Sequence, residues 1–206
     1  MKIAVFVSGG GTNLQAIIDN TKDGILKDIE ISLVLSSSKT AYALERAADN
    51  GIKSAVVSKK DFDSIESWDD AVLAAVEDSG AELIVLAGYL SLMGPKVVAK
   101  YSNRIINIHP ALIPSFCGAG MYGIRPHQAA LAKGVKVSGA TVHFVNENYD
   151  EGPILLQKAI DVLPNDTPET LQKRIMQECE WKILPEAIRL IADGRVMIEN
   201  NIARVI

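Results

Sequence analysis

The sequence predicts a single-domain, Rossmann-like α/β protein: a mostly parallel central sheet, helices on both faces and an antiparallel C-terminal extension. Over residues 1–110, short apolar runs alternate with longer segments of helical periodicity, which is the pattern of parallel strands buried on both faces. A turn of three glycines, Gly9–Gly11, joins the first apolar run to the first helical segment. In residues 111–206, two β-rich stretches flank a short polar turn, which predicts an antiparallel pair.

The first half supplies the parallel part of the sheet. Its predicted strands are runs rich in β-branched and aliphatic residues, at 3–7, 31–35, 55–57, 82–87 and 104–108. The predicted helices lie between them, at 13–25, 41–50, 64–79 and 95–101. Thr12 and Gln15 have the spacing of a capping box, so the first helix is expected to begin at Thr12 or Asn13.

The second half opens with a loop, residues 110–125, that holds two prolines and three glycines. A short helix is predicted at 126–133. The two β-rich stretches follow at 135–146 and 153–162.

The C-terminal part is predicted to be helical. Thr167 and Pro168 are a typical helix start. The helix is expected to run toward Asp193, with a kink or a division at Pro185. No linker, internal repeat or low-complexity segment interrupts the chain, so residues 1–206 are predicted to be one domain made of the two halves.

Composition excludes several classes of protein. Hydrophobic residues make up 48% of the chain, which is ordinary for a globular protein. The net charge is −4 and the basic residues are scattered, which argues against a nucleic-acid partner. No apolar run reaches the roughly 18 residues that cross a bilayer, and the N-terminus lacks a signal-peptide pattern, so we predict a cytoplasmic protein with no membrane partner. The two cysteines, Cys117 and Cys179, form no disulfide framework, and no Cys or His spacing predicts a metal site.

The glycine turn predicts a phosphate site, because a helix N-terminus offers unpaired N–H groups and glycines let a ligand approach the backbone. A dinucleotide is not favoured: Leu14 stands where the third glycine of that fingerprint belongs, and the second strand ends LSSSKT without an acidic residue. No Gly-Lys-Ser/Thr follows, which excludes a P-loop, and no basic residue lies between Lys2 and Lys22. We expect backbone and hydroxyl groups to hold one terminal phosphate. A tight turn without a ligand is the alternative.

A second polar set follows the fifth predicted strand. His109 ends the strand, and Asn107, two residues earlier, points to the same face. Ligands of open α/β sheets bind at the carboxyl ends of the strands, and a polar pair on an apolar strand is unfavourable to bury without a purpose. Asp150, in the polar turn, is the natural carboxylate partner. These three residues supply an amide donor, an imidazole and a carboxylate, although a single strand histidine is also common as a satisfied core residue.

Five segments, taken in order and spacing, resemble the phosphoribosylglycinamide formyltransferase family: SGGGTNLQAI, LAGYL, NIHPALIP, GATVHFV and DEGPIL. The resemblance covers nearly the whole chain. The Asn-x-His-Pro and Asp-x-Gly-Pro elements are shared with methionyl-tRNA formyltransferase and formyltetrahydrofolate deformylase, whereas the GGGTN loop is more specific. Those two relatives normally carry an extra domain, for which this chain is expected to have no room.

The resemblance implies transfer of a formyl group from 10-formyltetrahydrofolate to the amine of N1-(5-phospho-D-ribosyl)glycinamide, in de novo purine biosynthesis. It implies small-molecule substrates, no metal, and a monomer or homodimer. His109, Asn107 and Asp150 would be catalytic. The amine attacks directly and gives a tetrahedral oxyanion, which Asn107 and a protonated His109 would stabilise. Asp150 would raise the pKa of His109 and take part in proton transfer.

The resemblance also implies binding residues. Gly11, Thr12 and Asn13 would hold the ribose phosphate. Gln177 and Glu180 would hold the ribose or glycinamide end, with a plain helix surface as the alternative. Residues 1–110 would then be the phosphate-binding half, and residues 111–206 the folate-site and catalytic half. The residues implied to bind the folate are Tyr89, Leu90, Ser91, Leu92, Asn107, Asn146, Glu147, Asn148, Tyr149 and Asp150.

Some residues depart from this pattern or stand outside it. His143 is interpreted as structural and His127 as loop support. Relatives often carry arginine at the positions of Ile65 and Ser91, where it helps to hold the folate tail, and Arg125 is a candidate replacement. Two other functions stay open: hydrolysis of 10-formyltetrahydrofolate, which needs no phosphate loop, and a non-catalytic nucleotide-sensing module, which leaves the polar set unexplained.

Overall fold

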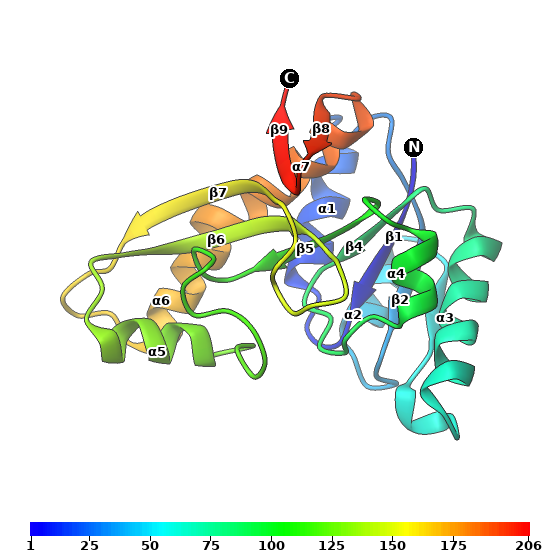
Figure 1. The fold of residues 1–206 in the computed structure, drawn as a ribbon, viewed down its shortest axis with the longest axis horizontal. Coiled ribbons are helices and arrows are strands. Elements are labelled where there is room, and N and C mark those ends of the chain that lie inside the picture. Colours follow the sequence, from blue (N-terminus) through cyan, green and yellow to red (C-terminus); the bar gives the residue numbers. More distant parts are fainter. The chain divides into compact units, whose positions relative to one another are not determined.

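Five parallel strands build the sheet of the N-terminal unit, Met1–Asn107 (Figure 1). Their order is β3-β2-β1-β4-β5 in a computed structural model that describes residues 1–206, and each neighbouring pair is parallel. The strands are β1 (Lys2–Val7), β2 (Glu30–Ser36), β3 (Ser54–Val56), β4 (Leu83–Leu86) and β5 (Ile105–His109), and β5 continues past the end of the unit.

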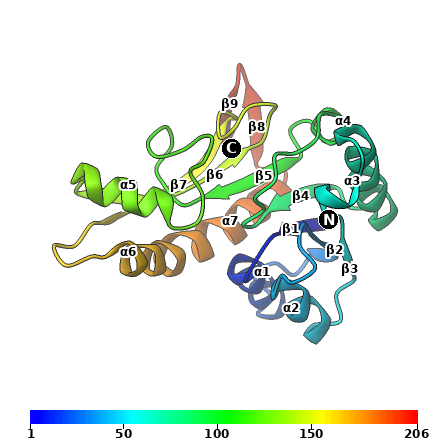
Figure 2. The same ribbon diagram turned by 90° about the horizontal axis from the view of Figure 1, so that it is seen from below.

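Helices cover both faces of this sheet. Figure 2 shows α1 and α2 on one face and α3 and α4 on the other. Right-handed crossovers explain the division, because the chain moves from β1 toward β3 along one direction and then returns through β4 to β5 along the other. The helices are α1 (Thr12–Lys22), α2 (Ala43–Asp49), α3 (Ile65–Ser79) and α4 (Pro95–Lys100), with a short 3-10 helix, η1 (Lys59–Asp61).

The two central strands are buried along most of their length. Residues Ile3 to Phe6 of β1 have no exposed surface, and all four residues of β4 are buried. Burial of one such aliphatic side chain stabilises the fold by about 1.5–3 kcal/mol. This double-sided burial is the reason why the strands are continuous apolar runs rather than alternating ones.

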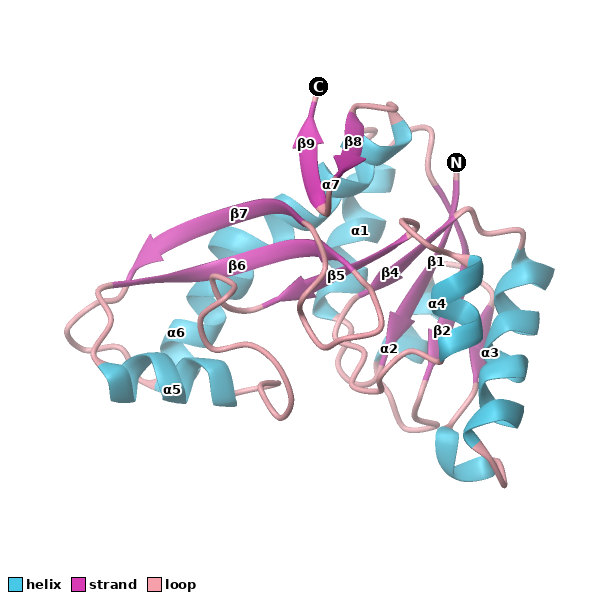
Figure 3. Cartoon of the chain, viewed as in Figure 1, coloured by secondary structure: helices cyan, strands magenta, loops and turns pink.

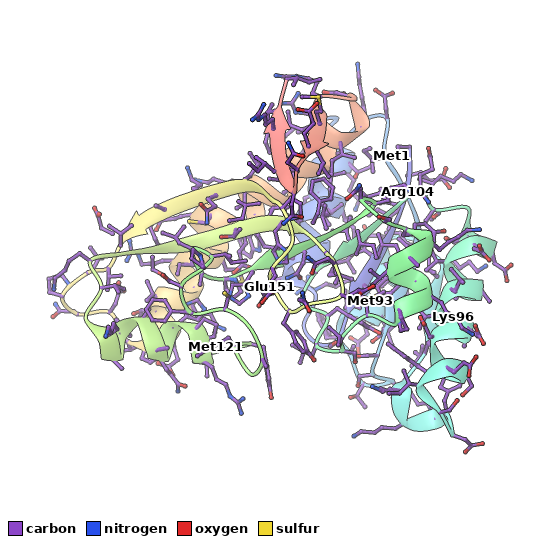
Figure 4. All side chains as sticks on the ribbon, viewed as in Figure 1. Met1, Met93, Lys96, Arg104, Met121 and Glu151 are labelled. Carbon is purple, nitrogen blue, oxygen red and sulfur yellow. The ribbon has the colours of Figure 1, made fainter.

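A buried carboxylate fixes the start of α4. Asp69 on α3 accepts hydrogen bonds from the backbone N–H groups of Lys96 (2.7 Å) and Val97 (3.4 Å). A side chain at Gly94 would overlap this carboxylate, so the N-cap of α4 has to be glycine. At the surface, the Lys96 ammonium bonds Asp70 of α3 at 2.6 Å (Figure 4). These contacts hold the first turn of α4, and with it the C-terminal end of the segment that joins β4 to α4, against α3.

The C-terminal unit, Ile108–Ile206, contains an antiparallel pair. Strand β6 (Val137–Phe144) pairs with β7 (Ile154–Asp161). Figure 3 shows the long loop that precedes α5 (Arg125–Lys133) in pink. This loop includes a cis peptide bond between Ile113 and Pro114.

The predicted C-terminal helix is divided, but not at the proline. It consists of α6 (Pro168–Ile175), a π-helical turn η2 (Met176–Glu180) and α7 (Trp181–Ala192). Pro185 lies inside α7. A proline crowds the carbonyl four residues before it, which belongs to Trp181, and the wide π turn ends immediately before that residue. The turn thus moves the irregularity upstream of the proline.

A short C-terminal hairpin was not predicted. Strands β8 (Val196–Glu199) and β9 (Ile202–Val205) pair antiparallel around Asn200 and Asn201, which both have positive φ (49° and 62°). Two asparagines between two short apolar runs are a hairpin signal that the sequence did contain.

The structure confirms the predicted α/β class, with a mostly parallel sheet, flanking helices and an antiparallel C-terminal part. No helix combines the length and the apolar character that a membrane span requires.

Candidate active site

The glycine loop of the N-terminal unit leaves open space beside its backbone. Gly9 and Gly10 are exposed, and a Cβ added to either would have no atom within 4 Å. Packing within the unit therefore does not require glycine there, whereas close approach of a ligand to the backbone would. Helix α1 begins at Thr12, and no side chain caps its N-terminus. This is the arrangement that an anion needs at a helix start.

Gly11 differs from its neighbours. Its φ is 70°, and an added Cβ would lie 2.6 Å from the Cβ of Ala43 on α2. The Ala43 N–H also donates to the Gly9 carbonyl (3.1 Å). Glycine at position 11 is thus required both by the backbone conformation and by the close packing of α2.

The capping box predicted from Thr12 and Gln15 is wrong. The Gln15 side chain accepts a hydrogen bond from Arg46 Nη1 (2.9 Å) and donates one to Asp19 (2.9 Å). Arg46 Nε donates to the Gly10 carbonyl (2.8 Å). A guanidinium therefore lies at the loop, although the neighbouring sequence contains no basic residue. It comes from α2, whose first turn meets the same edge of the sheet.

The segment after β4 carries four of the folate residues predicted in this unit. Tyr89 is buried against Phe6, with ring centroids 5.2 Å apart, and burial raises the pKa of Tyr89 to about 12. Its neighbours Leu90 and Leu92 are 58% and 39% exposed, and Ser91 is half-buried. The Leu90 N–H donates to the Ser8 hydroxyl (2.9 Å). The segment thus presents two apolar side chains from a backbone tied to the end of β1.

In the C-terminal unit, the structure brings His109 and Asp150 together. His109 is 4% exposed, and its Nδ1 lies 3.6 Å from Asp150 Oδ2. Its Nε2 donates to the Phe116 carbonyl (2.9 Å), which can only accept. A neutral His109 therefore carries its proton on Nε2 and presents an unprotonated Nδ1 to the carboxylate. A proton taken up at Nδ1 would be stabilised by Asp150.

His143, which the sequence analysis interprets as structural, also lies beside Asp150. Its Nε2 lies 3.4 Å from Asp150 Oδ1, and its Nδ1 donates to the Phe144 carbonyl (2.8 Å). Asp150 therefore lies between two imidazoles, each with its second ring nitrogen fixed by a backbone carbonyl. The GATVHFV strand contains a signal for a role at this site, because Thr141 and His143 are two residues apart and therefore lie on the same face of β6.

Burial and hydrogen bonding set the charges of this cluster. Burial lowers the pKa of His109, and the nearby Asp150 carboxylate, which raises it, is the weaker influence. For Asp150 burial raises the pKa, but the contacts with His143 and the Gly118 N–H (2.8 Å) outweigh burial and lower it. Asp150 therefore raises the pKa of His109 as expected, but burial outweighs this influence and the net shift is downward.

The Asp150 turn has a constrained backbone. Asp150 has φ 55°, and Phe116, whose carbonyl accepts from His109, has φ 53°. Left-handed φ at non-glycine residues is uncommon, and such strain clusters at functional sites. A side chain at Gly152 would overlap the Phe144 carbonyl, which explains the glycine of the Asp-x-Gly-Pro element. Glu151, which stands between Asp150 and Gly152 in the sequence, is labelled in Figure 4.

The other predicted positions lie as follows. The turn from Asn146 to Asp150 is held by an Asn148 N–H to Asn146 Oδ1 hydrogen bond (3.0 Å), with Glu147, Asn148 and Tyr149 exposed. Gln177 is exposed and Glu180 is buried, both in the π turn η2, so the helix-surface alternative does not describe Glu180. π turns often occur at functional sites.

Three further predicted residues lie on β5 and at the start of α1. Asn107 is half-buried on β5, two residues before His109. Thr12 is half-buried and Asn13 buried at the start of α1. No group of three or more His, Cys, Asp or Glu side chains is placed to hold a metal ion.

The fold and this donor set define a formyltransferase-type site. Residues 1–188 match the family described as formyl transferase, and the chain belongs to that family. It is similar to the phosphoribosylglycinamide formyltransferase of Arabidopsis thaliana chloroplasts, with 41% identity over 196 residues, 95% of this chain and 66% of that protein. It is also similar to the trifunctional purine biosynthetic protein adenosine-3 of Gallus gallus, with 40% identity over 198 residues.

The lengths of these relatives differ from that of the chain, which spans about two thirds of the Arabidopsis protein and covers 19% of the Gallus one. Among solved structures, glycinamide ribonucleotide transformylase 1 from Symbiobacterium toebii matches with a TM-score of 0.94 and 42% identity, over 100% of this chain and 94% of that one. The resemblance inferred from the motifs is thereby confirmed.

Proposed function

We propose that the protein transfers the formyl group of 10-formyltetrahydrofolate to the amine of N1-(5-phospho-D-ribosyl)glycinamide, a step of de novo purine biosynthesis. The observation that carries the proposal is the buried His109, whose Nδ1 faces Asp150 at 3.6 Å. The names of the similar proteins support the same substrates. The open glycine loop supports a phosphorylated acceptor rather than water.

The reaction needs two proton movements. The attacking amine bonds to the formyl carbon and loses a proton, and the folate N10 gains one as its bond to that carbon breaks. A neutral His109 can accept a proton at Nδ1, where Asp150 stabilises the imidazolium. Asn107 donates to the oxyanion of the tetrahedral intermediate. His143 holds the Asp150 carboxylate in place from its other side.

Binding is assigned by the same proposal. Gly11, Thr12 and Asn13 hold the ribose phosphate, and Gln177 and Glu180 hold the ribose or glycinamide end. The folate contacts come from residues 86–93 and 146–150. Residues 1–206 then act as one formyltransferase domain, with a phosphate-binding half at 1–110 and a folate-site and catalytic half at 111–206. The proposal includes a cytoplasmic protein that is a monomer or homodimer, with no metal.

A purified sample tests the proposal directly. It should form formylglycinamide ribonucleotide only when both substrates are present, and omission of either should abolish the product. Release of formate from 10-formyltetrahydrofolate alone, at the rate seen with the acceptor, would show a hydrolase instead. Binding of a nucleotide without any folate turnover would show a nucleotide-sensing module.

A further inference from the structure

Arg46 makes three contacts with the glycine loop and its surroundings, all within the N-terminal unit. Its Nε donates to the Gly10 carbonyl (2.8 Å), although the two residues are 36 positions apart. Its Nη1 donates to Gln15 in the first turns of α1 (2.9 Å), and its guanidinium carbon lies 5.0 Å from the centroid of the Tyr42 ring. The guanidinium is therefore held by two hydrogen bonds and by the Tyr42 ring on one of its faces.

These contacts set the direction of two peptide groups. In a trans peptide the C=O and the N–H point in opposite directions. The Gly9 carbonyl accepts from Ala43 and the Gly10 carbonyl accepts from Arg46, so α2 draws both carbonyls toward itself. The N–H groups of Gly10 and Gly11, which share those peptides, consequently point away from α2.

A clamp of this kind is necessary because the loop cannot orient itself. Gly9 and Gly10 have no side chains and no packing neighbours at their Cβ positions, and glycine backbones visit many conformations. A flip of the Gly10–Gly11 peptide would present a carbonyl to an incoming phosphate instead of an N–H. Both hydrogen-bond partners of Arg46 are neutral, so its positive charge also adds to the field at the loop.

We infer that Arg46 is a positioning residue for the phosphorylated substrate: it holds the Gly10–Gly11 peptide with the N–H toward the phosphate. The inference rests on the proposed function, which assigns a phosphate to this loop. Arginine is specifically needed, since lysine has a methylene at the position of Nε and cannot donate from there. In this role Arg46 orients the peptide whose N–H binds the phosphate, and its own side chain does not contact the phosphate.

The test compares Arg46→Lys and Arg46→Met with a matched control, Arg104→Met. Arg104 also stacks on a tyrosine (4.8 Å to the Tyr101 ring) and donates to a backbone carbonyl (Lys100, 2.6 Å), but it precedes β5 at the opposite edge of the sheet (Figure 4). Both Arg46 variants should raise the KM for the ribonucleotide about 10- to 100-fold, the loss expected for one charge-assisted hydrogen bond. The kcat and the KM for the folate should stay within about threefold, and the control should match the wild type.

Two further measurements separate positioning from other roles. The activity with a phosphate-free glycinamide riboside should be nearly the same in wild type and variants, because the clamp matters only for the phosphate. Ribose 5-phosphate should shift the Gly10 and Gly11 amide resonances in the wild type, and these shifts should be lost in Arg46→Lys. This readout does not depend on turnover, so it stands even if the acceptor substrate is another phosphate ester.

Several results would overturn the inference. A wild-type KM in Arg46→Lys together with a raised KM in Arg46→Met would mean that Arg46 acts by charge alone. Unchanged KM values in both variants would mean that the loop holds its own orientation. Equal losses with both acceptors, with a lowered Tm, would show a purely structural role. Absence of formyl transfer in the wild type, with intact ribose 5-phosphate binding, would instead refute the proposed function and leave the clamp standing.

Discussion

The glycine loop and the Asp150 cluster differ in burial and in the groups that form them. The loop is exposed and built from backbone, and the Arg46 guanidinium donates a hydrogen bond to one of its carbonyls. The cluster is built from side chains, with His109 and His143 4% and 2% exposed around one carboxylate. An exposed backbone site can have open space around it, but contacts from a neighbouring element have to orient its peptide groups. A buried side-chain site has its geometry fixed by packing, and its difficulty is the charge that burial suppresses.

The largest expected effect comes from breaking the buried cluster. His109→Ala should reduce kcat by about a hundredfold to ten-thousandfold, because it removes the group that accepts and returns protons. Asp150→Asn should cause a similar loss, and the double variant little more, since the two residues act as a unit. Single-turnover rates at saturating substrates measure this, with circular dichroism as the check on folding. A folded His109→Ala protein with near wild-type turnover would contradict the assignment.

The second effect separates two kinds of glycine within the loop. Gly11→Val should destabilise the protein by about 2–4 kcal/mol, because the added side chain meets Ala43 and the φ of 70° is strained for valine. Gly10→Ala should change the unfolding free energy by less than about 1 kcal/mol, because its surroundings are open. Yet Gly10→Ala should weaken ribonucleotide binding, which Gly11→Val cannot test cleanly.

Urea unfolding and calorimetric titration measure the two quantities separately. Equal stability losses for the two variants would mean that the open space beside Gly10 is filled in solution. Unchanged ribonucleotide affinity in Gly10→Ala, with folate affinity as the internal reference, would mean that the phosphate does not approach this side of the loop.

The third effect concerns stability in acid and comes from a histidine outside the cluster. His127 is 1% exposed, neither ring nitrogen has a hydrogen-bond partner, and burial lowers its pKa to about 4, with His109 a smaller influence. An unfolded histidine titrates near about 6.5. Between these values the unfolded chain binds a proton that the native state does not, so stability falls as the pH drops from about 6.5 to about 4.

Replacing His127 with leucine should flatten that loss. The full shift corresponds to about 3 kcal/mol as an upper bound, and part of the slope should persist because burial also lowers the pKa of His109. Unfolding free energies at pH 7.5, 5.5 and 4.5 for both proteins provide the measurement. Parallel pH profiles for wild type and His127→Leu would show that His127 gains a partner in solution, such as water.

How far the sequence could predict this structure depended on the range of the forces involved. The strands of the parallel sheet were predictable because double-sided burial of residues such as Ile3–Phe6 leaves a local apolar pattern. His109 and Asp150 could be paired from their residue types, because an imidazole that ends a strand and a carboxylate in a polar turn are natural partners. Arg46 could not be found, since its partner Gly10 is 36 positions away and nothing local marks it.

Other features depended on detail that composition and spacing do not carry. The direction of the pKa shift of His109 depends on two opposing influences, since burial lowers the pKa and the Asp150 carboxylate raises it. A sequence does not show how deeply a side chain is buried. The role of His143 depends on the turn that returns Asp150 to β6 at 3.4 Å. The hairpin at Asn200 and Asn201, in contrast, was a missed local signal and not a limit of the sequence.

The smallest effect adds charge to a region that holds none. Ser91 is half-buried beside the exposed Leu90 and Leu92. The resemblance implies that an arginine at this position would help to hold the folate tail. Arg125, the candidate replacement, stacks on Tyr122 at 4.7 Å and donates to the Gly120 carbonyl (3.2 Å) within its own loop. Recognition of the tail should therefore be loose while the pterin end stays unaffected.

Ser91→Arg should tighten folate binding by up to about fivefold at low salt, the limit for an exposed ion pair, and leave kcat unchanged. The gain should largely disappear at high salt, because exposed charges are screened. Ile25→Arg, which adds the same charge at an exposed residue beyond the end of α1, is the matched control and should leave the Kd unchanged. If Ser91→Arg has the wild-type Kd at both salt concentrations, the tail does not pass this position. The apolar segment 86–93 would then recognise only the uncharged end of the folate, just as the proposed function assigns only the phosphate to the glycine loop.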